Sequence, residues 1–364
     1  MRSGKDFWEL LRNSNNSSLF DGGGEWYSRI DYLKKRFDYS ILYYRKTEVG
    51  SIQINGGASA GGKSYTNLYQ GIVKYPFDRV RSIKLMFGVR TDKLVLRPGD
   101  DPALDTFLLK QADVNKQTYG LVRMEYVYDN VVQKSLNIMN GLRYKLYIDW
   151  AGQMNDVTGT EGRSTFNAGF DGRYYYPIFR NFIWAFRGAG DFSWGSKKII
   201  YYLGGVDGWL FPQYNLSPRP ADPDYAFQSL AVNLRGFKQN TANGNNNVVI
   251  NSEIRAPLFS TLLNRPINNA FLRNFQLVQF FDLGSAWNGA YDKIERPHVI
   301  YIDPQNPNVA VKIKAGGLGP LAGSYGFGAR STLLGYFLRL DVAWEMNSFF
   351  KGKPMFMVSM GLDF

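Results

Sequence analysis

Cysteine is absent from this chain of 364 residues, and histidine occurs once, at His298. Disulfides, thiolate metal sites and His-based metal clusters are therefore excluded. A Ser-His-Asp triad would depend on that one histidine, which follows Pro297 in an apparent loop. The 31 carboxylates show no spacing suited to acid–base work. We expect no enzymatic activity, no metal and no cofactor.

Long apolar runs are also lacking. No segment approaches the ~18 residues of a membrane-spanning helix, and the mean hydropathy is −0.29. The segment 1–25 lacks the apolar core of about 7–15 residues that a secretory signal requires. These absences exclude a helical membrane protein, but a membrane-spanning β-barrel gives a much weaker signal and stays open.

The C-terminal residues alternate between apolar and small or polar side chains. One face of this segment carries Phe356, Val358, Met360, Leu362 and Phe364. Period two is the period of a strand, and an apolar face suits a strand in contact with lipid. The ending resembles the C-terminal insertion signal of bacterial outer-membrane barrels. The last strand of a soluble sandwich is the alternative.

The same alternation recurs along the chain. In residues 335–346, Leu338, Leu340 and Val342 alternate with Arg339 and Asp341. A soluble sandwich would alternate as well. Aromatic residues make up 16% of the chain and recur near segment ends, as expected for girdles at two membrane interfaces. The sequence therefore predicts an all-β, transmembrane antiparallel β-barrel.

The segments with this pattern define the domain organisation. We expect strands near 26–33, 37–46, 65–75, 80–91, 118–130, 141–152, 163–175, 181–194, 248–257, 274–285, 322–333, 335–346 and 354–364, with a weak one near 49–57. Residues 1–25 form a lead-in or linker, and 26–364 form the barrel. That is roughly 13 or 14 strands, whereas single-chain bacterial barrels have even numbers. Together with the missing export signal, this predicts additional upstream polypeptide or accessory subunits.

The formal net charge of +12 is unusual for this class. A basic balance can indicate nucleic acid or an anionic surface. The lysines and arginines, however, are spread singly along strands and loops, with no basic helix. We expect them to line a lumen or to meet lipopolysaccharide, and we expect no nucleic acid partner.

Four central motifs point to a family. In chain order they are a Gly-Gly pair, an Arg-Gly-Phe tripeptide, a strand Asn-Ser-Glu-Ile-Arg-Ala-Pro and a strand Phe-Phe-Asp-Leu-Gly. The candidate site residues within these motifs are Gly204, Gly205, Arg235, Gly236, Phe237, Glu253, Arg255, Phe280, Asp282 and Gly284. This arrangement resembles the barrel of the outer-membrane protein assembly factor superfamily, which includes BamA, TamA and FhaC-type transporters. The resemblance covers about residues 180–364 strongly, and the earlier strands by pattern alone. The family barrel has about 16 strands.

The resemblance implies that a loop, about 196–247, folds into the lumen and that Arg235 docks beside Asp282 on the wall. Strand parity agrees, because Asp282 lies opposite the apolar Phe281 and would be costly if buried unpaired. Arginine supplies a bidentate partner, and Gly236 permits a tight turn. The alternative is a solvated Arg235 and an ordinary lumen charge at Asp282.

Three other residues of these motifs have expected places on the same wall. Glu253 and Arg255 point inward by the same parity and can extend the network. Phe280 shares the inward face with Asp282. Gly284 is expected to leave room for Phe237.

Three features fall outside the family pattern. The insert 206–233 is longer than in BamA-like chains, resembles members that carry a propeller-like periplasmic domain, and is a candidate docking surface for a partner. Residues 57–64 match the phosphate-loop pattern G-x-x-x-x-G-K-S, but a strand rather than a helix is expected after them, so a flexible Gly/Ser hairpin loop is favoured. The stretch Asn240–Asn247 is expected to be a mobile turn.

The functional expectations follow from the resemblance. The first is assembly or insertion of client proteins at the bacterial outer membrane, by strand pairing at an open edge and without nucleotide. The second is a protein-secretion pore of the two-partner type. The third is an anchor for a periplasmic or surface domain. Expected partners are outer-membrane lipid, lipopolysaccharide, client proteins and a periplasmic domain or accessory subunits.

Overall fold

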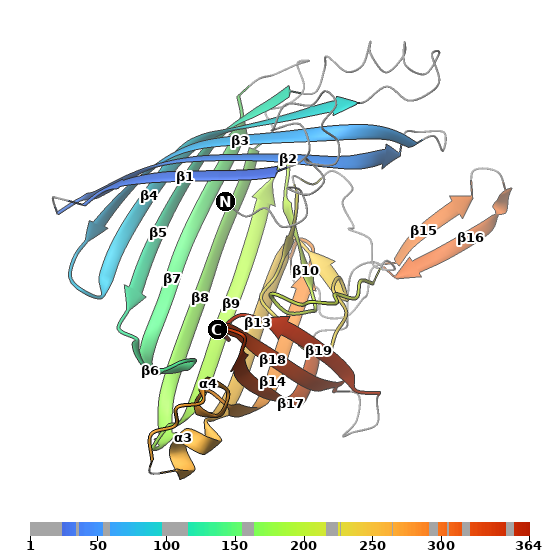
Figure 1. The fold of residues 1–364 in the computed structure, drawn as a ribbon. Helices are drawn as coiled ribbons and strands as arrows, with labels where there is room; N and C mark the ends of the chain where they lie inside the picture. The colour runs from blue at the N-terminus through green and yellow to red at the C-terminus, as the bar shows by residue number, and fades with distance from the viewer. Residues whose placement is uncertain are drawn as a thin grey trace, which may run out of the picture. The chain divides into compact units, whose positions relative to one another are not determined.

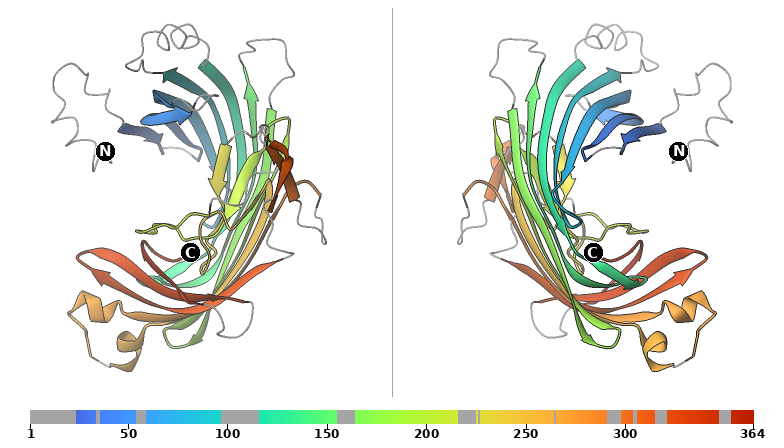
Figure 2. Two further views of the ribbon diagram at one scale, coloured as in Figure 1. Left: turned by 90° about the vertical axis from the view of Figure 1, so that its right-hand side faces the viewer. Right: turned by 90° about the vertical axis from the view of Figure 1, so that its left-hand side faces the viewer.

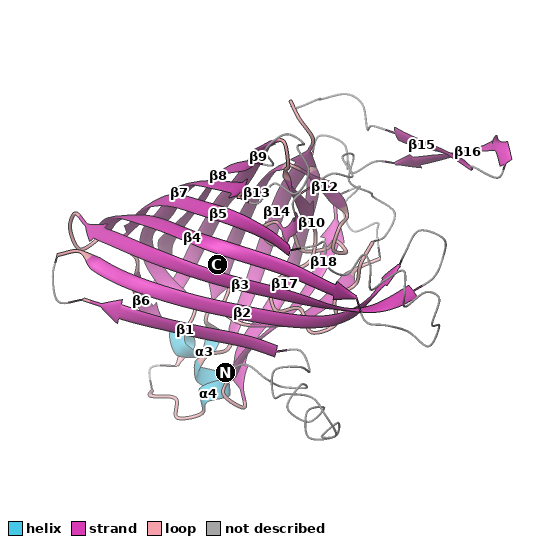
Figure 3. Ribbon diagram, turned by 90° about the horizontal axis from the view of Figure 1, so that it is seen from above, coloured by secondary structure: helices cyan, strands magenta, loops and turns pink. Residues whose placement is uncertain are grey.

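The described part of the chain is built almost entirely of strands. The computed structural model describes residues 24–33, 36–53, 59–96, 116–154, 164–215, 225, 227–263, 265–290, 298–303, 306–314, 321–346 and 353–364. Within these ranges the helices are two short ones, α3 (Leu258–Leu262) and α4 (Ala270–Arg273) (Figure 3). None of the described helices is long and apolar enough to cross a membrane.

One antiparallel sheet contains most of the strands (Figure 1). Its members are β1 (Gly24–Tyr32), β2 (Asp38–Gln53), β3 (Ser59–Pro76), β4 (Arg81–Leu96), β5 (Lys116–Asp129), β6 (Val132–Ser135), β7 (Ile138–Gln153), β8 (Ser164–Phe179), β9 (Phe182–Gly195), β13 (Asn246–Ala256), β14 (Gln276–Trp287), β17 (Ala322–Leu333), β18 (Tyr336–Glu345) and β19 (Met355–Met360). The order is β1-β2-β3-β4-β5-β7-β8-β9-β13-β14-β17-β18-β19, and β6 pairs with β7. The predicted all-β antiparallel class is confirmed.

The chain divides into two compact units. Unit 1 comprises residues 1–125 and 149–164, and unit 2 comprises 126–148 and 165–364. In unit 1, β1 to β4 pair in sequence order. Their exposed side chains include Trp26, Ile30, Ile41, Leu85, Phe87 and Val89. Glu125 is buried in the same unit and accepts hydrogen bonds from Lys84 and Arg123.

The sheet of unit 2 has apolar side chains exposed and polar ones buried. On β13, Ile250 and Ile254 are exposed, whereas Glu253 and Arg255 are 1% and 0% exposed. On β14, Asp282 is 0% exposed, while Leu277 and Phe281 of the same strand are exposed. We call the face that carries Asn251, Glu253, Arg255 and Asp282 the inner face, and the opposite one the outer face. A sheet of a water-soluble protein has the reverse polarity.

The long loop between β9 and β13 covers the inner face. It contains a small sheet of β10 (Ile199–Leu203), β11 (Phe227–Leu230) and β12 (Ala242–Gly244), with the order β11-β10-β12. Strand β10 lies against β9, β13 and β14. Figure 2 gives two further views of this loop, coloured yellow-green to yellow, beside the sheet. Leu203, Leu234 and Phe237 form an apolar cluster with wall residues that include Val249. The loop is therefore packed onto the sheet of unit 2.

Several expected element boundaries are wrong. The strand 37–46 and the weak strand 49–57 are one continuous strand, β2, as far as Gln53, and residues 54–58 lie outside the described part. The phosphate-loop residues Ser59–Ser64 belong to β3 and pair with β2, so this part is strand rather than hairpin loop. His298 is the first residue of β15 (His298–Asp303), which forms a separate hairpin with β16 (Asn306–Lys314) instead of a loop. Residues 1–23 of the expected lead-in lie outside the described part.

The stretch Asn240–Asn247 was expected to be a mobile turn, and that is also wrong. Residues 242–244 form β12, and Asn243 and Asn247 are buried. The side chain of Asn245 donates to the carbonyl oxygen of Ser193 at 2.6 Å and accepts from the N–H of Gly289 at 2.9 Å. Side-chain amides thus satisfy backbone groups of neighbouring segments and order this stretch.

Candidate functional site

Two glycines directly follow β10 in the loop. Gly204 and Gly205 have φ values of +103° and +82°. A Cβ atom at Gly204 would lie 1.9 Å from the carbonyl oxygen of Lys238, so only glycine fits there. The N–H of Gly205 donates to the carbonyl oxygen of Phe237 at 3.0 Å, and the N–H of Leu234 donates to that of Gly205 at 3.1 Å. These contacts bring the Gly-Gly and Arg-Gly-Phe motifs side by side.

Arg235 forms a bidentate ion pair with Asp282 on β14. The Nε–Oδ2 and Nη2–Oδ1 distances are both 2.7 Å, and the backbone N–H of Arg235 also donates to Oδ2 at 3.2 Å. The two side chains are 5% and 0% exposed. Asn251 donates a further hydrogen bond to Oδ1 of Asp282 at 2.9 Å and another to the carbonyl oxygen of Asn233. The carboxylate therefore binds both the backbone and the side chain of the loop.

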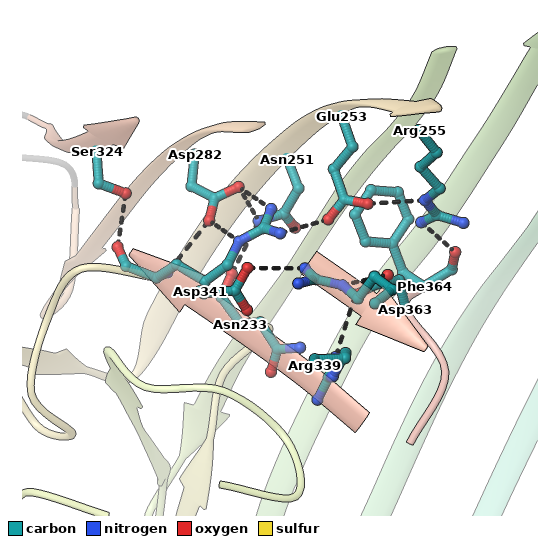
Figure 4. A network of polar contacts seen from close by, with 12 residues as sticks. Asn233, Asn251, Glu253, Arg255, Asp282, Ser324, Arg339, Asp341, Asp363 and Phe364 are labelled. Atoms are coloured by element: carbon teal, nitrogen blue, oxygen red, sulfur yellow. Dashed lines mark hydrogen bonds and ion pairs between the residues drawn. The ribbon is translucent and has the colours of Figure 1, made fainter. Parts of the chain in front are cut away.

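Arg235 has three further contacts, two through its guanidinium and one through its backbone. Its Nη1 donates to Oε1 of Glu253 at 2.5 Å, and its Cζ lies 3.8 Å from the centroid of the Phe280 ring. The carbonyl oxygen of Arg235 accepts from the hydroxyl of Ser324 at 2.6 Å. Burial disfavours the charged guanidinium, but the carboxylates of Asp282 and Glu253 outweigh it and hold the pKa of Arg235 well above its usual value. Figure 4 shows Glu253, Asp282 and Ser324 with their polar contacts on the inner face.

Glu253 connects this ion pair to a second arginine. Its Oε2 accepts from Nε of Arg255 at 2.8 Å. Arg255 also donates to the carbonyl oxygen of Asn137 at 3.1 Å and to that of Phe364 at 3.0 Å. The network therefore reaches from the inward loop to the last residue of the chain.

A second group of charges surrounds Asp363, near the C-terminus. Arg330 contacts Asp363 at 2.9 Å and Asp341 at 2.8 Å, and Arg339 contacts Asp363 at 3.4 Å. Asn137 donates to Oδ2 of Asp363 at 2.9 Å. Across both groups, four buried arginines face four buried carboxylates, so the formal charges cancel: Arg235, Arg255, Arg330 and Arg339 with Glu253, Asp282, Asp341 and Asp363. Mutual pairing is what makes burial of so many charges tolerable.

Gly236 and Phe237 follow Arg235 on the inner face. Gly236 has φ +82°, and a Cβ there would lie 3.1 Å from Cβ of both Ser324 and Ala343. Phe237 is 4% exposed. The prediction that Gly284 makes room for Phe237 is wrong, because the atoms nearest a Cβ at Gly284 belong to Leu234 and Val249. Leu234 occupies this space, and its backbone N–H is hydrogen-bonded to the carbonyl oxygen of Gly205.

The predicted C-terminal signal divides between the two faces. Phe356, Met360 and Leu362 are exposed, and Val358 is partly exposed. Phe364 was expected on the same side, and that is wrong. Gly361 has φ +118°, β19 ends at Met360, and Phe364 is buried with Ile138, Tyr175, Ile183 and Ala185. The turn at Gly361 breaks the two-residue period and directs the last side chain to the inner face.

The motifs missed several residues of the network. Arg339 and Asp341 lie on the polar face of the segment 335–346, opposite its apolar face. The two-residue period of this strand therefore predicts that both side chains point inward. Arg330 has the same signal on its strand. Asn137, with φ +62° in the β6–β7 hairpin, carried no such signal. The described residues hold no group of three or more His, Cys, Asp or Glu side chains that could bind a metal.

Comparison with known proteins gives structural likeness only. No protein-family model matches the sequence, and no curated protein matches it. The structure is similar to BamA from Haemophilus ducreyi lacking POTRA domains 1–3, with 14% identity, a TM-score of 0.49 and coverage of 93% of this chain and 68% of that one. It is similar to CdiB from Escherichia coli (11% identity, TM-score 0.48, 94% and 53% covered) and from Acinetobacter baumannii (11%, 0.46, 92% and 49%). The chain thus spans about half the length of the CdiB chains.

Proposed function

We propose that this chain is a β-barrel of the bacterial outer membrane that assembles or translocates other proteins, without catalysis or nucleotide. The observation that carries the proposal is the inward loop, held on a polar inner face by the ion pair of Arg235 and Asp282. A wall with its apolar side chains exposed suits lipid, because apolar surface is stable against hydrocarbon. As partners of this barrel we propose lipopolysaccharide and a periplasmic domain or accessory subunits.

Assembly is favoured over secretion by the short last strand. Strand β19 has 6 residues, whereas β18 has 10 and β17 has 12. A short terminal strand has fewer ladder hydrogen bonds to break when the edge opens. An opened edge can template a client strand, and the gain in backbone hydrogen bonds supplies the driving force in lipid.

The test is reconstitution of the chain into liposomes together with a small unfolded outer-membrane barrel as client. The proposal expects the liposomes to speed folding of the client, as followed by its heat-modifiable mobility on gels, with no nucleotide present. Liposomes that hold Arg235→Ala, checked by circular dichroism for retained strand content, should lose most of this acceleration. Client folding at the rate of protein-free liposomes would contradict assembly, and a large ion conductance in the same liposomes would support a secretion pore.

A further inference from the structure

A piece of the insert lies along the last strand of the sheet. Residues Gly208–Leu210, which we call the edge segment, run antiparallel to β19 and form a bridge between Trp209 and Ser359. The N–H of Leu210 donates to the carbonyl oxygen of Val358 at 2.9 Å, and the N–H of Met360 donates to that of Gly208 at 3.0 Å. Strand β19 pairs with β18 on its other side, and the strand order of the main sheet ends at β19. The edge segment therefore occupies the outward edge of β19.

The contact is shaped for close approach. Gly208 has φ +67°, and a Cβ there would lie 2.1 Å from the carbonyl oxygen of Met360. Trp209 is 9% exposed and packs with Val206, Phe280, Ala343 and Met357. Arg339, a member of the charge network, donates to the carbonyl oxygen of Asp207. Glycine, tryptophan and a charged anchor thus place the edge segment on β19.

The pairing is also short. Two backbone hydrogen bonds hold the edge segment, whereas β18 pairs with β19 along six residue pairs, from Ala343↔Met355 to Leu338↔Met360. The hydroxyl of Ser359, under the bridge, is buried with no hydrogen-bond partner among the described residues. A longer extended peptide can form more ladder bonds with β19 than the edge segment does, although the edge segment benefits from being tethered.

We propose that the edge segment is a resident strand that closes the edge of β19 and that an extended segment of a client polypeptide displaces it. The incoming strand would place a large apolar side chain where Trp209 lies and a small residue opposite Met360. This inference rests on the proposed function for the identity of the client, but the exchange at the edge is measurable without any client.

The first test uses the natural absence of cysteine. Ser359→Cys places a reporter thiol beneath the bridge, in the full chain reconstituted in liposomes. We expect slow reaction with a maleimide, and acceleration of at least about tenfold when Gly208→Ala is added, because exposure requires local opening. Gly289→Ala is the matched control, because Gly289 also has φ +67° but a Cβ there meets nothing within 4 Å. Equal labelling in all three proteins would overturn the proposal.

The second test measures occupancy of the edge with a fluorescent peptide that has the sequence of residues 206–213. It should bind the Gly208→Ala protein and fail to bind the protein with native Gly208. Failure to bind a Gly208→Ala protein whose reporter thiol is accessible would show that the released edge accepts no strand, and would overturn the proposal. Pairing of the released edge with a second copy of the chain instead of with the peptide, detected as a cross-linked dimer, would also overturn the proposal.

The third test locks the edge. Cross-strand residues without mutual hydrogen bonds have Cα atoms about 4.5 Å apart, which suits a disulfide. Trp209→Cys with Ser359→Cys should therefore cross-link on oxidation. The oxidised protein should lose client assembly and regain it on reduction, which serves as its own control. Full client assembly by the oxidised protein would overturn the inference and leave the proposed function intact. If no form of the protein, the native one included, assembles the client, the proposed function is overturned. The labelling and peptide results then decide the inference.

Discussion

Arg235 of the inward loop and Asp282 of the wall meet through two parallel hydrogen bonds of 2.7 Å, and both side chains are almost fully buried. Glu253 accepts a hydrogen bond from Nη1 of the same guanidinium. One arginine thus bridges two carboxylates from adjacent strands, β13 and β14. Through these contacts, Arg235 anchors the loop electrostatically to both strands.

Removal of the anchor should release the loop and spare the sheet. Arg235→Ala leaves two buried carboxylates without their shared partner, which costs about 3–5 kcal/mol when the site is desolvated. Asp282→Ala should cost less, because Arg235 keeps Glu253. Hydrogen exchange of residues 227–244 in liposomes measures loop docking, and circular dichroism checks the strands.

The double variant Arg235→Ala, Asp282→Ala should be little worse than Arg235→Ala alone, since the two residues act as one unit. Additive losses of docking free energy in this cycle would show that the two side chains act independently, and would refute the lock.

Lysine at position 235 should rescue the loop poorly. Its ammonium is a point charge without the planar fork that bonds Asp282 twice and Glu253 once. We expect Arg235→Lys to retain charge neutrality but to lose most client assembly in the liposome assay. Assembly at the native rate would mean that charge alone, rather than bidentate geometry, holds the loop.

Gly236 should tolerate no side chain. Gly236→Ala adds a Cβ 3.1 Å from side-chain atoms of Ser324 and Ala343, in a left-handed conformation that itself costs about 1–2 kcal/mol. Gly335→Ala is the matched control, because Gly335 has φ +83° and open space around it. Only Gly236→Ala should increase hydrogen exchange in the loop. Equal effects of the two substitutions would show that backbone strain, and not crowding at the wall, is responsible.

The C-terminal tail should depend on the inner face. Phe364→Ala removes a buried ring that lies 5.1 Å from the Arg255 guanidinium, and should weaken docking of the tail by on the order of 3 kcal/mol. Leu362→Ala, at an exposed position two residues earlier, should have little effect. Protease accessibility of residues 361–364 in liposomes distinguishes the two, and equal accessibility would place both side chains in the same environment.

Strand parity predicted much of the site. Asp282, Glu253 and Arg255 follow from the two-residue period of their strands, because the opposite face is mostly apolar. The contact between Arg235 and Asp282 was predicted from the order of the motifs, because a loop has no side-chain period from which to predict it. The same limit explains why the pairing of the edge segment with β19 was missed: it is a long-range contact between a loop and a strand.

The turn at the C-terminus shows a different limit. Alternation continues through Leu362 and Phe364, so the pattern extends the last strand to the end of the chain. The structure ends β19 at Met360, because Gly361 adopts a left-handed conformation and Asp363 finds three basic or amide partners on the inner face. Alternation of apolar and polar residues indicates which face of a strand is apolar, but it does not indicate where the strand ends.

The central claim is that the outer face of unit 2 meets lipid, and spin labelling tests it most directly. Single cysteines at Ile250, Ile254, Leu277 and Phe281, in the naturally cysteine-free chain, carry nitroxides in liposomes. A fifth label at Leu334, 89% exposed in the turn between β17 and β18, reports water. We predict that the four strand labels are accessible to oxygen and shielded from a water-soluble nickel chelate, while the label at Leu334 is open to the chelate. Chelate accessibility at the four strand positions equal to that at Leu334 would contradict it.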